Sequence, residues 1–184
     1  MNQFIEKAKL VLTKPSKFFE GVKKEEGVQP AFTYFAVISL VNLVLGTAAS
    51  YLFLRSLLGT SVSLPTLIVS YVISLLFAFV VAGILHVWIK LFRGKGNYAK
   101  TFQLYVYSDT PKMLIGWIPF IGSLIGSVYG LILLIIGGEI LHGFSRRRSI
   151  FVFVIPAVIV IVLAVLALIG SLAFLTLMPG LSSQ

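Results

Sequence analysis

The stretch IFVFVIPAVIVIVLAVLALIGSLAFLTLM, residues 150–178, decides the fold class because none of its 29 residues is charged. A helix needs about 20 mostly apolar residues to cross the ~30 Å hydrocarbon core of a bilayer. Three more runs reach this length, namely residues 31–54, 64–89 and 119–141. Among the three, Glu139 is the only formally charged residue. The sequence therefore predicts an all-α integral membrane protein.

The composition of the whole chain supports this class. Of the 184 residues, 58% are hydrophobic and 11% are charged, and the mean hydropathy is +1.03. Soluble domains usually carry about 25% charged residues, so we exclude a soluble globular enzyme and a disordered tail. In a soluble protein the net charge of +9 would suggest nucleic acid as a partner. Here the basic residues flank apolar runs, so we expect anionic lipid headgroups and no nucleic acid.

Residues 101–118 form a weaker candidate for a fifth span because they include Asp109, Pro111 and Lys112. The basic residues decide the count, since cytoplasmic loops carry an excess of Lys and Arg. With five spans the two sides hold 13 and 2 basic residues, whereas with four the arginines at 146–148 change sides. We therefore predict a five-helix bundle with spans at 31–54, 64–89, 101–118, 119–141 and 150–178, a cytoplasmic segment 1–30 and a short extracytoplasmic tail 179–184.

The cytoplasmic segment is predicted to contain a basic amphipathic helix. Five apolar residues between Phe4 and Leu12 fall on one helical face, and Pro15 then starts a second short turn. Such a helix lies in the membrane interface, packs beneath the loops of its own bundle, or binds a partner helix. The three alternatives remain open at this point. The residues expected to contact anionic headgroups are Lys7, Lys9, Lys14, Lys17, Arg93, Arg146, Arg147 and Arg148.

Two predicted spans carry small residues at every fourth position. Small side chains let helix backbones approach closely in lipid, where the hydrophobic effect does not drive helices together. The simplest interpretation is packing inside the bundle, and the alternative is a homo-oligomer that associates through the same faces. The residues expected on these faces are Gly122, Gly126, Gly130, Gly138, Ser70 and Ser74.

Several ionisable residues lie within the predicted spans, although a charge at the bilayer centre costs at least ~2.5–3.5 kcal/mol. They favour either a structural polar network or a site that transports protons, ions or small solutes. Asp109 and Lys112 can neutralise each other as i, i+3 neighbours. Glu139 and His142 have the spacing of a metal-binding pair, but further ligands are too few, so we predict no metal and no cofactor. The candidate polar residues are Asp109, Lys112, Glu139, His86 and His142.

The common catalytic signatures do not occur in this sequence. It contains no G-x-x-x-x-G-K, no H-E-x-x-H, no G-x-S-x-G and no cysteine. We therefore assign no catalytic residue and do not expect an enzyme.

The order of four short motifs resembles the Yip1 family of multispanning membrane proteins. The motifs are TKPSKFF at 13–19, TFQLYVYSDTP at 101–111, IPFIG at 118–122 and HGFS at 142–145. The resemblance implies five spans, a cytoplasmic N-terminus and a non-catalytic role in organising membrane or scaffolding partners. The family positions carried over to this chain are Pro15, Phe18, Phe19, Tyr107 and Pro111.

The chain departs from the eukaryotic members, which act in Golgi and endoplasmic-reticulum trafficking with Rab-type GTPases. Its N-terminal segment is short and lacks their Asp-Leu-Tyr-Gly-Pro motif, and Val106 stands where they have glycine. We therefore do not expect a Rab-type partner. The resemblance to short prokaryotic members implies a location in the cell membrane. An ion or small-solute transporter that uses the polar residues above is the alternative function.

Overall fold

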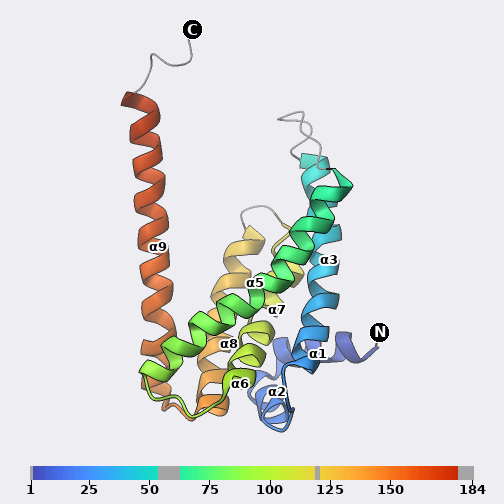
Figure 1. Ribbon diagram of the computed structural model, residues 1–184, viewed down its shortest axis with the longest axis vertical. Coiled ribbons are helices and arrows are strands. Elements are labelled where there is room, and N and C mark those ends of the chain that lie inside the picture. The colour runs from blue at the N-terminus through green and yellow to red at the C-terminus, as the bar shows by residue number, and fades with distance from the viewer. Residues whose placement is uncertain (1, 54–62, 119–120, 178–184) are drawn as a thin grey trace.

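The computed structural model describes residues 2–53, 63–118 and 121–177, and no strand occurs within these ranges (Figure 1). The structure therefore confirms the all-α prediction. Its helices are α1 (Asn2–Thr13), α2 (Pro15–Val22), α3 (Gln29–Phe53), α5 (Leu64–Leu91), α6 (Tyr98–Ser108), α7 (Thr110–Ile115), α8 (Ile121–His142) and α9 (Arg146–Leu177).

Four of these helices, α3, α5, α8 and α9, are long and apolar enough to cross a membrane. They coincide with the four charge-poor runs of the sequence. Their outer surfaces are apolar, and Ile84 of α5 and Val160 of α9 are 67% and 64% exposed. Apolar surface of this extent indicates contact with lipid. α9 begins at Arg146, four residues before its charge-free run, because the three arginines extend the helix beyond the apolar part.

The predicted span 101–118 is a broken helix in the structure. α6 ends at Ser108 and α7 begins at Thr110, and Pro111 lies in the first turn of α7. Proline lacks a backbone N–H and clashes with the preceding turn, which accounts for this break. The helical path nevertheless continues, since the Met113 N–H donates to the Asp109 carbonyl at 3.0 Å.

α6 is the most completely enclosed helix of the described chain. It contacts α3, α5 and α8, and the chain's N-terminal helices lie at the same end of the molecule, where α2 packs on α8 (Figure 1). Its buried side chains are Thr101, Phe102, Gln103, Leu104, Val106, Tyr107 and Ser108.

The N-terminal segment packs against the bundle, which is one of the three alternatives from the sequence. Val11 of α1 and Phe19 of α2 are fully buried, and α1 also contacts α7. Ile5, which the sequence placed on the same apolar face, is 62% exposed instead. Most of the apolar face of α1 and α2 is therefore covered by the chain itself.

The glycine row of α8 faces α6 and α7 within the same chain. Gly122, Gly126 and Gly130 are buried. A Cβ atom on Gly126 would lie 2.6 Å from Lys112 Cα, and one on Gly130 would lie 2.8 Å from the Ser108 carbonyl oxygen. Gly138, further along, faces Phe153 and Ser149 of α9. Only glycine allows these backbones to approach so closely.

The second predicted row is corrected by the structure. Ser70 and Ser74 are exposed, whereas Ala78 and Ala82 of the same row are buried. The two serines border a cavity between α3 and α5 and do not contact a facing helix there. Four-residue spacing places side chains on one helical face, but it does not determine whether another helix covers that face.

We expect Gly126→Ala to lower the melting temperature of the purified protein by several degrees. The new methyl group would displace the α7 backbone, and overpacking of this kind costs about 1–3 kcal/mol. Thermal unfolding in one detergent measures the effect. Gly83→Ala in α5 is the matched control, because nothing lies within 4 Å of its added Cβ. An unchanged melting temperature for Gly126→Ala would contradict the packing described here.

Candidate functional site

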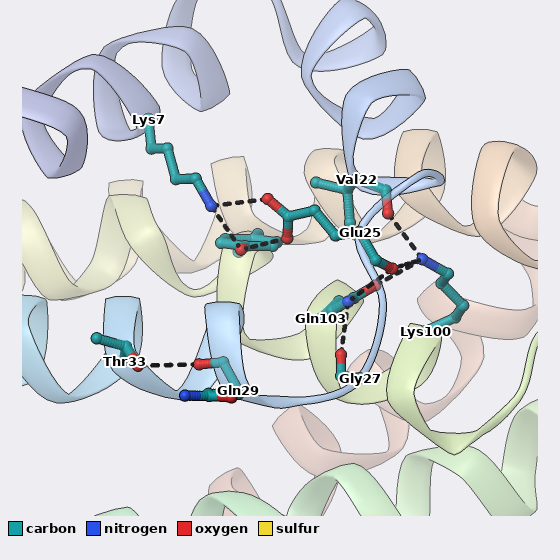
Figure 2. Close-up of polar contacts among 9 residues, drawn as sticks. Lys7, Val22, Glu25, Gly27, Gln29, Thr33, Lys100 and Gln103 are labelled. Carbon is teal, nitrogen blue, oxygen red and sulfur yellow. Dashed lines mark hydrogen bonds and ion pairs between the residues drawn. The ribbon is translucent and has the colours of Figure 1, made fainter.

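A network of polar contacts fastens the N-terminal segment to α6 (Figure 2). Lys7 Nζ of α1 lies 2.7 Å from Glu25 Oε1 and donates to the Tyr107 hydroxyl at 3.2 Å. The Tyr107 hydroxyl in turn donates to Glu25 Oε2 at 2.8 Å. The three side chains therefore join α1, the connection after α2, and α6, which are far apart in the sequence.

Two further side chains of α6, Lys100 and Gln103, bind backbone carbonyls of that connection (Figure 2). Lys100 Nζ donates to the Val22 carbonyl at 2.7 Å, and Gln103 Nε2 donates to the Gly27 carbonyl at 2.8 Å. Carbonyls at the end of a helix lack partners within it and attract a cation, so Lys100 caps α2.

Aromatic packing around Tyr107 strengthens the same junction. The Phe18 ring meets the Tyr107 ring edge-on, with their centroids 4.8 Å apart, and Tyr34 packs on the other side at 5.3 Å. Phe19 and Pro111 are also buried, and Pro15 starts α2. The 13–19 and 101–111 motifs of the sequence therefore meet in space at this junction.

Two histidines, of which His142 is buried and His86 is partly exposed, lie against one hydroxyl of α6. His86 Nδ1 of α5 lies 2.7 Å from Thr101 Oγ1, and His142 Nε2 of α8 lies 3.4 Å from the same atom. His142 is fully buried, and its Nδ1 has no hydrogen-bond partner among the described residues. Because a hydroxyl has one hydrogen, Thr101 can donate to at most one of the two rings, and its oxygen also lies 3.5 Å from the Asn97 carbonyl oxygen.

The remaining polar residues form separate contacts. Glu139 Oε1 lies 2.8 Å from Arg146 Nε at the start of α9, although the angle does not meet hydrogen-bond criteria. No ion pair within 4.0 Å joins Asp109 to Lys112 in the part of the chain that the structure describes. Lys112 is exposed while Asp109 is partly covered, so their expected neutralisation by direct pairing is not observed.

The candidate polar residues predicted from the sequence therefore do not form one site. His86 and His142 meet at Thr101, while Glu139 contacts α9 and Asp109 lies at the junction of α6 and α7. None of these residues lines either of the two cavities found between α3 and α5. Residues 2–53, 63–118 and 121–177 contain no group of three side chains able to hold a metal ion.

Sequence reasoning missed Glu25, Lys100, Thr101 and Gln103 as members of these networks. Thr101 and Gln103 carried a usable signal, because polar side chains inside an otherwise enclosed helix require hydrogen-bond partners. The partner of each could not be identified from spacing. Glu25 carried no such signal, since it lies in a polar connection where an exposed carboxylate is ordinary.

We expect Lys100→Gln to loosen the segment from α2 to the start of α3. The shorter neutral side chain cannot supply the charge-assisted bond to the Val22 carbonyl, a type worth about 1.5–3 kcal/mol. Amide hydrogen exchange of residues 15–28 should become about tenfold faster or more, by the same magnitude. Lys95→Gln, an exposed lysine at the same end of the molecule, is the control and should leave exchange unchanged. Equal exchange in both variants would contradict the role of Lys100.

One of the comparisons with known proteins identifies a family. No curated protein and no solved structure matches the chain. A family model described as the Yip1 domain matches residues 9–169, a range that includes α2, α3, α5, α6, α7 and α8 and most of α9. The chain therefore belongs to the Yip1 domain family.

Proposed function

We propose that this protein is a non-catalytic membrane organiser whose basic end holds anionic lipid headgroups in a fixed arrangement. The observation that carries the proposal is the fastening of the N-terminal segment to α6 through Lys7, Glu25 and Tyr107. A tethered but free basic helix would hold lipids loosely. Here the exposed lysines of α1 and α2 are fixed relative to the bundle.

The exposed basic side chains gather at one end of the bundle. Trp88 Nε1 near the end of α5 donates to the Val152 carbonyl near the start of α9, and the Lys95 N–H donates to the His142 carbonyl at the end of α8. These bonds hold the α5–α6 and α8–α9 connections together beside α2, which packs on α8. The exposed residues of this basic end include Lys9, Lys14, Lys17, Arg93, Arg147 and Arg148.

Two of the predicted headgroup contacts have intramolecular partners instead. Lys7 pairs with Glu25, and Arg146 pairs with Glu139. These pairings follow from position, because both basic residues lie within reach of a carboxylate of a neighbouring segment. We therefore assign Lys7 to the fastening of the N-terminal segment and leave lipid contact to the exposed residues.

The proposal includes a fifth crossing by α6 and α7 together. Residues 98–115 would extend about 27 Å along a helix axis, close to the ~30 Å of hydrocarbon. The pair follows α5 and precedes α8, and it places the starts of α6 and α9 at the same end of the molecule (Figure 1). The N-terminus would then be cytoplasmic and the C-terminus extracytoplasmic.

The alternative of a transporter is not favoured by any particular contact. A transport pathway requires polar residues that line a continuous cavity. The candidate residues are divided among three places, and the cavities described between α3 and α5 do not reach them. We therefore interpret the His86–Thr101–His142 contacts as structural.

Five crossings predict that Lys95→Cys and Ser145→Cys are labelled from the same side of the membrane. The natural chain has no cysteine, so each variant carries a single reactive thiol. Ser63→Cys, at the start of α5, should be labelled from the opposite side. Membrane-impermeant maleimide added to sealed, oriented vesicles measures this. Labelling of residues 95 and 145 from opposite sides would indicate four crossings and contradict the fifth.

We expect association with phosphatidylglycerol to weaken at least about tenfold when the exposed Lys9, Lys14 and Lys17 are all replaced with glutamine. The reason is that each basic residue near an anionic surface contributes about 1 kcal/mol. Electron paramagnetic resonance of spin-labelled lipid in reconstituted vesicles gives the association constant. Replacement by arginine is the matched control, because it keeps the charge, and Lys112→Gln tests a lysine elsewhere. Equal association in the glutamine and arginine variants at low salt would refute the proposal.

A further inference from the structure

We propose that a cleft between α3 and α5 binds a neutral lipophilic alcohol, a hydrocarbon molecule with one hydroxyl group. Two cavities lie side by side there, of about 710 and 250 Å³, and Leu43 and Tyr71 line both of them. The combined space falls within the usual size of small-molecule sites, roughly 300–1,000 Å³.

The larger cavity is suited to a hydrocarbon chain. Apart from Thr47 and the hydroxyls of its two tyrosines, its lining is aliphatic or aromatic, with Val44 of α3 and Leu64 of α5 among the side chains. Val44 and Leu64 are 61% and 69% exposed, so the cavity opens on the outer, apolar surface of two long helices. A molecule dissolved in the hydrocarbon of the bilayer could enter from the side.

The smaller cavity adds polar atoms that are oriented as acceptors. The Ser70 hydroxyl donates to the Leu67 carbonyl at 2.9 Å, and the Ser74 hydroxyl donates to the Tyr71 carbonyl at 2.7 Å. The Tyr71 hydroxyl likewise donates to the Ala36 carbonyl at 2.7 Å. Each hydroxyl hydrogen is thus occupied, while each oxygen keeps a lone pair free to accept. A ligand group that donates a hydrogen bond fits this lining.

Ser39 has the same character, whereas Asn42 keeps a second N–H hydrogen as well as its Oδ1 acceptor. Ser39 donates to the Ala36 carbonyl, and Asn42 Nδ2 donates to the Met113 carbonyl at 2.7 Å. Ser74 lies ten residues after Leu64, about 15 Å along the helix and near the middle of the hydrocarbon. An acceptor-rich pocket at this depth explains why Ser70 and Ser74 occur in an apolar helix without contacting a facing helix.

The lining also excludes charged ligands. No Lys, Arg, Asp or Glu lines either cavity. A phosphate would place its oxygens against the lone pairs of the serines without a compensating cation, and an ammonium at this depth would remain an uncompensated charge. The fitting ligand is therefore neutral and differs from the anionic lipids proposed for the basic end.

A photoreactive hexadecanol, with a diazirine in its chain, tests this inference in phosphatidylcholine nanodiscs. We expect it to label α3 and α5 more strongly than the matched hexadecane or hexadecanoic acid probes. The double variant Ser70→Ala, Ser74→Ala should lower alcohol capture about three- to tenfold, the range for loss of one or two net hydrogen bonds. Both serines are exposed, so the variant should keep its melting temperature.

Ser171→Ala in α9 is the matched control, because its exposed hydroxyl also donates to a carbonyl three residues earlier, that of Leu168, at 2.8 Å. Leu67→Trp should fill the larger cavity and reduce capture of every probe. Equal capture of alcohol and hexadecane, or equal effects of the α5 and α9 serine variants, would overturn the inference. The glutamine variant of the three exposed lysines should capture the alcohol normally, which separates this result from the fate of the proposed function.

Discussion

The burial of polar side chains on α6 is the constraint on which the rest of the structure depends. A buried donor or acceptor left without a partner costs about 1–3 kcal/mol, and α6 buries Thr101, Gln103 and Tyr107. Each finds its partner on a different segment. Thr101 contacts the histidines of α5 and α8, Gln103 contacts the Gly27 carbonyl, and Tyr107 contacts Glu25.

This arrangement also requires the backbone of α8 to approach α6 and α7 closely, and glycine allows that approach. α6 and α7 are enclosed by α8 only because its backbone approaches theirs at Gly126 and Gly130. The break at Asp109 adjusts α7 to the same surface, since Pro111 prevents an undisturbed continuation of α6. Close backbone packing on one side and hydrogen bonding on the others therefore fix α6, and α6 in turn fixes the N-terminal segment.

The sequence was sufficient for the features that depend on composition along the chain. The charge-poor runs predicted the four long helices, and Pro111 accounts for the break in the predicted third span. The candidate site was predictable only in part, because depth along a helix does not give direction around it. His86 and His142 converge, whereas Asp109, another of the candidate polar residues, lies elsewhere. The packing contact predicted for Ser70 and Ser74 is not observed within the chain for the same reason, because their spacing does not reveal what faces them.

The two kinds of lipid contact proposed here require different parts of the fold. Headgroup binding in a fixed arrangement depends on long-range attraction, so it needs Lys9, Lys14 and Lys17 exposed at one end and the N-terminal segment fastened to α6. Recognition of a neutral alcohol depends on a shaped cavity, which requires α3 and α5 to stay at a fixed separation. The bond from the Tyr71 hydroxyl to the Ala36 carbonyl and the packing of the Phe32 ring against the Phe79 ring supply that fixed separation. Because α3 also packs on α6 and α7, the same enclosed helix that fastens the basic segment also supports the cleft.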